Sequence, residues 1–373
     1  DSFKGTFSSM EVINHLERGI TKFFPNAEIV KIPIADGGEG TVDAIFSATG
    51  GMIHEKGVTG PLGNKVVARF AMKDDLAIIE MAAASGITLI HEYERNPLET
   101  TSFGTGELIL EALDLGAKEI IIGIGGSATN DGGIGMLQAL GIVFKDEVGA
   151  VIGFGGKYLS KIKDISIENA DSRIQDTKIT VMCDVTNPLT GPQGATYTYG
   201  PQKGANLEQL AILEAGMIHY ESLLFEKFGV DVGKIPGSGA AGGLGAALVV
   251  FLSGSLRPGI ETILDLVAFD QQVMHADLVI TGEGRIDGQS IYGKVPIGIG
   301  KRCLDKKAKV IVLAGSVGMD ADQVYAHGID AIFSTIDKPM SYNEVLENAP
   351  LILDTAIDRM LRVIQLGMHL NSK

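Results

Sequence analysis

Hydrophobic residues recur along the chain at spacings that predict alternating helices and strands. Behind Ser8 and Glu11, which match a helix capping box, apolar residues recur every three or four positions as far as Pro25 and predict an amino-terminal helix. Residues 29–34 are a short apolar run with β-branched members, which predicts a buried strand. Beyond residue 276 this rhythm returns, and the pattern predicts strands at residues 277–281, 309–314 and 331–335 and a helix at residues 295–303. The alternation favours a parallel sheet covered by helices.

The middle of the chain has a different pattern. Apolar runs at residues 65–72 and 76–81 are separated only by a short polar turn, and two strands joined by so short a connection pair antiparallel. Further apolar patterns predict a helix at residues 105–115, a strand at residues 119–122, and a long helix between the capping residue Asn206 and Gly229.

We therefore expect an α/β protein with two domains. The first is a discontinuous Rossmann-like parallel-sheet domain made of residues 1–57 and 276–373. The second is an inserted α+β domain with a mixed sheet, residues 58–275. Two crossings of the chain between two domains form a hinge and a cleft, which is a favourable place for closing around a ligand.

The first of three glycine-rich segments, residues 123–133, follows a predicted strand and precedes a short predicted helix. Successive glycines let a backbone turn sharply and present several N–H groups to an anion. We therefore expect phosphate or substrate to bind at Gly125, Gly126, Ser127, Asn130 and Asp131. Read as Gly123-x-Gly125-x-x-Ala128, with Asp146 further along, the segment also matches a relaxed dinucleotide fingerprint, so that alternative stays open.

Two further glycine-rich segments lie nearer the carboxyl end. Residues 236–245 open a predicted helix, where Gly242 and Gly243 suit a phosphate, although close packing through small residues explains the same glycines equally well. Residues 281–294 lie at the end of a predicted strand and contain Gly288-x-x-x-x-Gly293-Lys294. Because Val295 stands where a P-loop has Ser or Thr, a standard P-loop mechanism is not supported, but Lys294 can still neutralise phosphate charge.

Charged side chains gather at the ends of the predicted strands. Carboxylates of this kind hold Mg²⁺ and orient a hydroxyl, while cations and backbone donors hold phosphates and any acid group of the acceptor, which is the set that phosphoryl transfer to an alcohol needs. The carboxylates are Asp36, Glu39, Asp131, Asp184, Glu283 and Asp287, and the cations are Lys4, Lys203, Arg285 and Lys294.

Composition excludes several other classes of function. The 31 Lys and Arg residues and 46 Asp and Glu residues give a net charge of −15, a field that repels nucleic acid and anionic membranes. Cys183 and Cys303 are too few for a disulfide framework and fit a reducing compartment. No targeting segment or membrane span is evident, so we expect a cytoplasmic protein with a small-molecule substrate. The sequence leaves the oligomeric state open.

Six segments together resemble the bacterial type 1 glycerate kinase family, in an order and spacing that cover essentially the whole chain. They are Asp1-Ser-Phe-Lys-Gly5, Ala35-Asp-Gly-Gly-Glu-Gly-Thr41, Gly125-Gly-Ser-Ala-Thr-Asn-Asp-Gly-Gly133, Cys183-Asp-Val, Gly239-Ala-Ala-Gly-Gly-Leu-Gly245 and Thr281-Gly-Glu-Gly-Arg-Ile-Asp287. Members of this family usually carry a short apolar strand before Asp-Ser-Phe-Lys-Gly, so we expect that this sequence is truncated at its first strand.

The resemblance implies ATP- and Mg²⁺-dependent phosphorylation of D-glycerate, with 2-phosphoglycerate favoured over 3-phosphoglycerate. On this hypothesis Lys4 and Arg285 hold the glycerate carboxylate or the transferring phosphoryl group, and Asp184 or Asp287 orients the attacking hydroxyl. Asp36 and Glu39 help to bind Mg²⁺. Further contacts to substrate or phosphate are expected from Ser2, Lys4, Gly125, Gly126, Ser127, Asn130, Asp131, Gly242, Gly243, Glu283 and Lys294.

Two other classes of function remain as alternatives. One is an NAD-dependent dehydrogenase that uses the segment beginning at Gly123, and the other is a non-catalytic protein that binds a sugar acid. The six carboxylates argue against the second alternative, because a protein that only binds an anion gains nothing from them.

Overall fold

The computed structural model describes residues 3, 6–34, 41–42, 45–46, 50–291 and 293–371. The chain divides into two compact units. Unit 1 comprises Asp1–Asp36, Asp43–Ala48 and Ile260–Lys373, and unit 2 comprises Gly37–Val42 and Thr49–Gly259. Each unit has its own sheet and its own hydrophobic core, so the predicted α/β class is confirmed.

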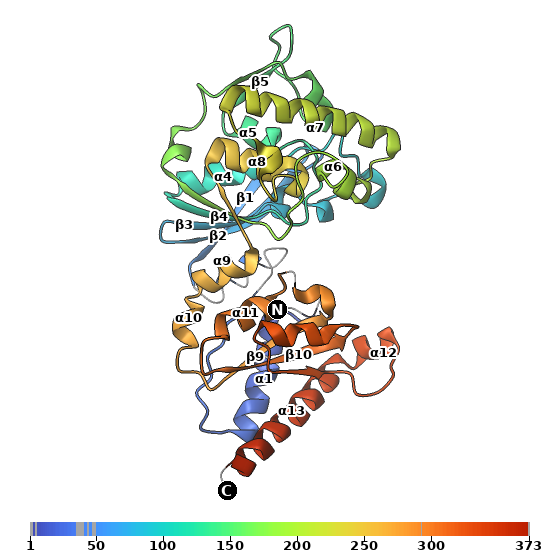
Figure 1. Cartoon of the computed structure of the whole chain (residues 1–373). Helices are drawn as coiled ribbons and strands as arrows, with labels where there is room; N and C mark the ends of the chain where they lie inside the picture. The colour runs from blue at the N-terminus through green and yellow to red at the C-terminus, as the bar shows by residue number, and fades with distance from the viewer. Residues whose placement is uncertain are drawn as a thin grey trace. The chain divides into compact units, whose positions relative to one another are not determined.

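Unit 2 is built on a six-stranded mixed sheet (Figure 1). Its strand order is β1-β2-β3-β4-β7-β8, in which β1, β2 and β3 pair antiparallel and the remaining neighbours pair parallel. The strands are β1 (Met52–Thr59), β2 (Lys65–Lys73), β3 (Leu76–Glu80), β4 (Glu119–Gly123), β7 (Lys178–Met182) and β8 (Ser255–Arg257). The predicted antiparallel pair is thus β2 and β3, whereas β1 was not predicted.

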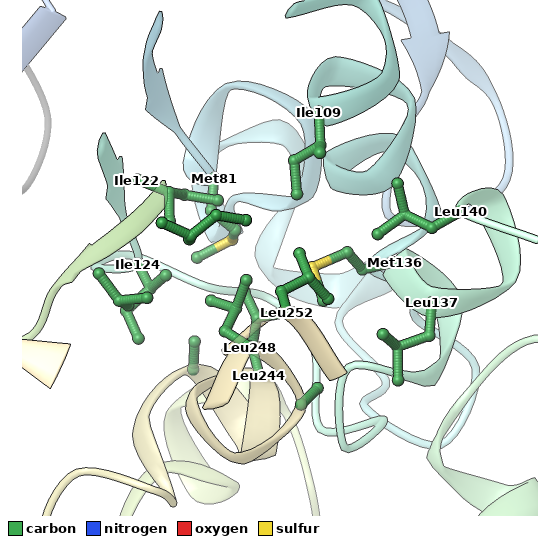
Figure 2. Packing of buried hydrophobic residues seen from close by; sticks show 14 of the residues in the cluster. Met81, Ile109, Ile122, Ile124, Met136, Leu137, Leu140, Leu244, Leu248 and Leu252 are labelled. Carbon is green, nitrogen blue, oxygen red and sulfur yellow. The ribbon is translucent and has the colours of Figure 1, made fainter. Parts of the chain in front are cut away.

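Helices on this sheet bury the main core of unit 2. Leu244, Leu248 and Leu252 lie on helix α8 (Ala240–Leu252). They pack against Met136 of helix α5 (Ile134–Ala139) and against other apolar side chains, including those of the sheet (Figure 2). The longer helices are α4 (Phe103–Asp114), α5 (Ile134–Ala139), α7 (Leu207–Phe228) and α8 (Ala240–Leu252). Smaller elements are α3 (Ala82–Ser85), α6 (Ala195–Tyr199), β5 (Val143–Lys145) and β6 (Asp164–Ser166).

Unit 1 contains a parallel three-stranded sheet in the order β11-β10-β9. Ile311 and Leu313 of the central strand join a core with two helices that pack against each other, α1 and α13 (Figure 1). Val310 and Val312 alternate with them and are buried on the opposite face, where α11 packs. The elements are β9 (Leu278–Ile286), β10 (Lys309–Val317), β11 (Ala331–Ser334), α1 (Ser9–Phe23), α9 (Gly259–Leu266), α10 (Phe269–Gln272), α11 (Val295–Cys303), α12 (Tyr342–Glu347) and α13 (Ala349–Asn371).

Local signals in the sequence predicted several helix ends correctly. The Ser8 hydroxyl accepts a hydrogen bond from the backbone N–H of Glu11, whose carboxylate accepts one from the backbone N–H of Ser8, which completes the capping box of α1. Asn206 caps α7 in the same way, and Gly229 ends that helix in the left-handed conformation with a φ of 70°. These interactions are local, so the sequence alone carries them.

Two predictions about strands are wrong. Residues 29–34 form no strand in the described structure, and Val30 is 56% exposed, because an apolar run becomes a strand only where a neighbouring strand supplies hydrogen bonds. The strand predicted to end at Thr281 instead continues to Ile286, because β10 extends to Val317 and pairs with it. Glu283 and Arg285 therefore lie on a strand rather than in a loop.

Within the described part of the chain, no helix combines the length and the apolar character that a membrane crossing requires.

Removal of a core side chain from unit 2 should destabilise it strongly. Leu248 is fully buried on α8, so we expect Leu248→Ala to lower the free energy of unfolding by about 2–5 kcal/mol. Leu207 is 87% exposed at the start of α7, and Leu207→Ala should change this free energy by less than about 0.5 kcal/mol. Urea unfolding followed by circular dichroism measures both, and equal losses would contradict the assigned packing of α8.

Candidate active site

The structure brings the described candidate residues together in two groups, one in each unit. The first group surrounds the segment after β4 in unit 2, and the second follows β9 in unit 1. The first contains Gly125, Gly126, Ser127, Asn130, Asp131, Asp184, Gly242 and Gly243, and the second contains Glu283, Arg285, Asp287 and Lys294.

Residues 124–133, here called loop 124–133, connect β4 to α5. Gly125 and Gly126 are exposed, and Gly126 has a φ of 73°, a left-handed conformation that favours glycine. The Gly126 carbonyl accepts a hydrogen bond from the Ile87 N–H (2.8 Å), and the Ala128 N–H donates one to the Ser85 carbonyl (2.9 Å). The loop therefore has a defined path, with its first two glycines open to solvent.

Asp131 is fully buried and organises the far end of this loop. Its carboxylate accepts hydrogen bonds from the Ser102 N–H (2.9 Å), the Ser102 hydroxyl (2.9 Å), the Gly133 N–H (3.1 Å) and the Gly135 N–H (3.3 Å). Burial raises the pKa of the Asp131 carboxyl, and these four hydrogen bonds act in the opposite direction. The geometry gives this carboxylate the task of holding the loop to the starts of α4 and α5.

Asn130, beside Asp131, is also fully buried. Its Nδ2 donates to the Thr196 hydroxyl at 3.2 Å, while its Oδ1 has no hydrogen-bond partner among the described residues. The backbone amides at the open end of the loop are thus more accessible to a ligand than the Asn130 and Asp131 side chains.

Sequence reasoning missed Ser102. This residue stands at the position that caps α4, but its side chain caps nothing there. Its hydroxyl instead donates to Asp131 and accepts a hydrogen bond from the Met136 N–H at 2.9 Å. The predicted helix begins only at residue 105, so the sequence did not single out Ser102 even as a cap, and nothing in it indicates a partner 29 positions away.

The glycines of the segment 236–245 allow close contact between two loops. The backbone is left-handed at Ala241, Gly242 and Gly243, inside the helix assigned as α8. A Cβ atom on Gly242 would lie 2.1 Å from the Thr129 carbonyl oxygen, and the Gly242 carbonyl accepts a hydrogen bond from the Gly132 N–H at 2.9 Å. Of the two interpretations left open by the sequence, close packing is therefore what these two glycines provide; phosphate binding there stays a prediction.

Asp184 lies just beyond the carboxyl end of β7, the strand next to β4 in the sheet. Its side chain is exposed, and Oδ1 accepts a hydrogen bond from the Gly259 N–H at 2.9 Å. Asp184 therefore anchors the chain where α9 begins, and a role toward a substrate hydroxyl stays a prediction.

In unit 1, Arg285 and Asp287 form an ion pair at the end of β9. Arg285 Nε donates to Asp287 Oδ2 at 2.9 Å, and the Arg285 side chain is 62% exposed. Asp287 Oδ1 also accepts from the Gln289 N–H (3.2 Å) and the Ser290 hydroxyl (3.3 Å). The Arg285 guanidinium holds the pKa of the Asp287 carboxyl below its ordinary value, so this group stays ionised at neutral pH.

Lys294 stands at the start of α11 beside this pair. Its Nζ donates to the Arg285 carbonyl oxygen at 2.7 Å and lies 3.9 Å from a carboxylate oxygen of Glu283. The Arg285–Asp287 pair borders a hollow of about 480 Å³, whose lining consists of Arg285, Asp287, Gly288, Gln289, Met319, Asp320 and Gln323. This volume is large enough for a small ligand, and both charge signs face it.

Ser2, Lys4, Asp36 and Glu39 lie outside the described residues. Across the described residues, no group of three or more His, Cys, Asp or Glu side chains is arranged to hold a metal ion. Mg²⁺ commonly uses only one or two carboxylates together with substrate phosphates, so the chemistry of Asp36 and Glu39 fits such a site.

The position of Lys203 was also missed, because the sequence identified this residue only as one of several cations. It ends the 3₁₀ helix η5 (Pro201–Lys203), and only 2% of its surface is exposed. Its Nζ donates to the Ser127 hydroxyl at 2.7 Å and to the Thr129 carbonyl oxygen at 2.6 Å. A buried cation beneath loop 124–133 is a feature that only the fold reveals.

Residues 1–365 match the family described as "Glycerate kinase family". The chain is 49% identical over 351 residues to the glycerate kinase of Bacillus subtilis (strain 168), covering 94% of this chain and 92% of that protein. It is 47% identical over 371 residues to the glycerate 2-kinase of Escherichia coli (strain K12), covering 99% of this chain and 97% of that protein.

A solved structure has the same fold. The crystal structure of a protein assigned as glycerate kinase 2, from Salmonella typhimurium LT2, superposes with a TM-score of 0.90 at 45% sequence identity. The match covers 99% of this chain and 97% of the other.

Gly242 and Gly229 offer a matched test of the contact between the two loops. Both have left-handed backbones, with φ values of 68° and 70°, but a Cβ on Gly229 would meet no atom within 4 Å. Gly229→Ala should therefore lower the free energy of unfolding by about 1–2 kcal/mol, the cost of a left-handed residue with a side chain. Gly242→Ala should lower the free energy of unfolding by about 1–3 kcal/mol more than Gly229→Ala does, because the Thr129 carbonyl must move. Equal losses in urea unfolding would show that the loops do not touch there.

Proposed function

The chain belongs to the glycerate kinase family, and from that premise we propose that it transfers the γ-phosphate of ATP to the 2-hydroxyl of D-glycerate. The product is 2-phosphoglycerate, with 3-phosphoglycerate disfavoured. The full-length similarity to the E. coli glycerate 2-kinase carries this conclusion, because it spans 99% of this chain and every glycine-rich loop. Phosphoryl transfer depends mainly on positioning and charge stabilisation, so the residues needed are donors, cations and orienting carboxylates.

The second group of residues, at the end of β9, supplies the cations of the reaction. The exposed guanidinium of Arg285 borders the hollow and can hold a carboxylate or a transferring phosphoryl group in two parallel hydrogen bonds. Lys294 adds positive charge beside it, and Glu283 and Asp287 balance that charge. The predicted contribution of Lys4 remains part of this proposal.

Asp287 or Asp184 orients the attacking hydroxyl. A carboxylate that is ionised at neutral pH can accept a hydrogen bond from a hydroxyl, and Asp287 meets this condition because Arg285 lowers its pKa. Hydrogen bonds from Arg285, from the Gln289 N–H and from the Ser290 hydroxyl keep the Asp287 carboxylate in one orientation. Asp184, just beyond the end of the strand next to β4, is exposed, and its Oδ1 accepts a hydrogen bond from the Gly259 N–H.

Nucleotide phosphates are expected at loop 124–133. The exposed glycines Gly125 and Gly126 leave the backbone open to an anion, and Ser127 follows them directly. Gly242, Gly243, Asn130 and Asp131 are buried and support the shape of this loop. Ser2 is proposed to contribute a further contact.

ATP is the phosphoryl donor, and Mg²⁺ is its proposed partner. When bound, Mg²⁺ neutralises charge that develops on the phosphates. Asp36 and Glu39 would hold it, together with oxygens of the substrate.

The domain arrangement is likewise a proposal. It consists of a discontinuous Rossmann-like domain made of residues 1–57 and 276–373, with an inserted α+β domain made of residues 58–275. The parallel three-stranded sheet of unit 1 and the mixed sheet of unit 2 support this assignment of sheet types.

The geometry disfavours the dehydrogenase alternative. The carboxylate of Asp146, which a dinucleotide fingerprint would place on a ribose, accepts hydrogen bonds from the Val148 N–H (3.0 Å) and the Ala150 N–H (2.9 Å) in an exposed turn. Asp146 is thus engaged in its own turn.

Purified protein should consume ATP in the presence of D-glycerate and Mg²⁺. Hydroxypyruvate and tartronate are compared in parallel, and phosphorus NMR identifies the phosphorylated carbon. Phosphate on the 2-oxygen couples to a single carbon-bound proton, whereas phosphate on the 3-oxygen couples to two. Binding of NADH without ATP consumption would support the dehydrogenase. Binding of D-glycerate without NADH binding and without ATP consumption would support a non-catalytic binding protein.

Asp287→Asn should reduce kcat about 10²-fold or more if this carboxylate orients the hydroxyl, with a smaller change in KM. Asp322 is an exposed carboxylate on the neighbouring 3₁₀ helix η8 (Ala321–His327) and does not line the hollow, so Asp322→Asn is the matched control and should leave kcat unchanged. Unchanged turnover of Asp287→Asn, with a large loss in Asp184→Asn, would transfer the role to Asp184.

A further inference from the structure

Lys203 carries a buried ammonium group beneath loop 124–133. Its two hydrogen bonds go to a hydroxyl and a carbonyl of the same loop, on Ser127 and Thr129. An ammonium has three N–H donors, and among the described residues this one makes no ion pair. A cation is costly to bury unless a negative partner accompanies it.

Asp131, the carboxyl group that acts electrostatically on Lys203, forms no ion pair with it. Asp131 favours the charged form of Lys203, but its carboxylate already accepts four hydrogen bonds from Ser102, Gly133 and Gly135. Burial outweighs this attraction and lowers the pKa of Lys203 to about 7. Near neutral pH the ammonium form of Lys203 is therefore only partly populated, and an anion bound close by would stabilise it.

Ser127 connects the buried cation to the open part of the loop. Its hydroxyl oxygen accepts from Lys203, which leaves its own O–H free to donate elsewhere. Ser127 is 7% exposed and follows the exposed Gly125 and Gly126. An anion above these glycines could accept hydrogen bonds from their amides and from a Ser127 hydroxyl polarised by the ammonium.

We propose that Lys203, acting through Ser127, supplies the positive charge with which loop 124–133 binds an anionic group of the substrates. The proposal deepens the kinase function and rests on it. The group recognised is a phosphate of the nucleotide or the carboxylate of the acid substrate. Lys203 is a positioning residue in this scheme, because Ser127 and the backbone amides touch the ligand.

The competing role is purely structural, in which Lys203 only fastens Ser127 to Thr129. The two roles differ in which ligands they affect. Loss of hydrogen bonds that only stabilise the loop would weaken the binding of every ligand, whereas loss of the positive charge would weaken the binding of anions alone.

Isothermal titration calorimetry of the full chain with ADP, D-glycerate and adenosine separates these roles. Lys203→Met should weaken binding of ADP or of D-glycerate about 10- to 100-fold, as expected for a lost hydrogen bond to a charged group, and leave adenosine binding unchanged. The ligand that loses affinity identifies the anion. Lys157→Met is the matched control, because Lys157 is a surface residue of the same unit paired with Glu99, and its removal changes the net charge equally.

Ser127→Ala removes the hydroxyl through which Lys203 would act on the ligand and keeps the Lys203 side chain. It is also the test variant if Lys203→Met does not fold. It should weaken the same anion and spare adenosine. The proposal is overturned if either folded variant binds both anions as the wild type does, or if adenosine loses as much affinity as the anion.

Pyrophosphate is titrated in parallel, so that anion binding by loop 124–133 can be tested even if the proposed kinase function is wrong. If wild-type protein binds neither ADP nor D-glycerate, the proposed function fails, and pyrophosphate then tests the loop alone. Weaker pyrophosphate binding in Lys203→Met than in Lys157→Met would support the proposal, and equal binding would refute it.

Discussion

The hydrogen bonds of the buried Asp131 carboxylate are the interaction on which the candidate site in unit 2 depends. They join loop 124–133 to the residue before α4 and to the first turn of α5, so three segments share one acceptor. Hydrogen bonds to a charged acceptor are about twice as strong as neutral ones. The exposed glycines Gly125 and Gly126 have no side chains with which to anchor this loop, and the hydrogen bonds of Asp131 hold its far end in place.

The two candidate groups use their cations differently. Arg285 is exposed and paired with Asp287, so its charge is solvated and balanced before any ligand binds. Lys203 is buried with only neutral oxygens as hydrogen-bond partners. An exposed, paired arginine suits recognition of a planar carboxylate or a moving phosphoryl group, whereas a buried lysine strengthens electrostatic attraction because little water screens it.

Glycine serves two separate purposes in these loops. Gly125 and Gly126 keep the surface of loop 124–133 open, whereas Gly242 and Gly243 allow a second loop to pack against its back. The same residue type thus creates access on one side and close contact on the other. Both purposes need the absence of a side chain, which is why the sequence pattern did not separate them.

The sequence by itself determined the features that local interactions control: the capping boxes at Ser8 and Asn206, the end of α7 at Gly229, the antiparallel pair β2–β3, and the family motifs. Tertiary structure decided what depends on partners far apart in the chain. Residues 29–34 form no strand in the described structure, and β9 continues to Ile286 because β10 pairs with it. Ser102 binds Asp131 instead of capping α4, and Lys203 lies beneath Ser127, because burial and hydrogen bonding are settled only when distant segments pack together.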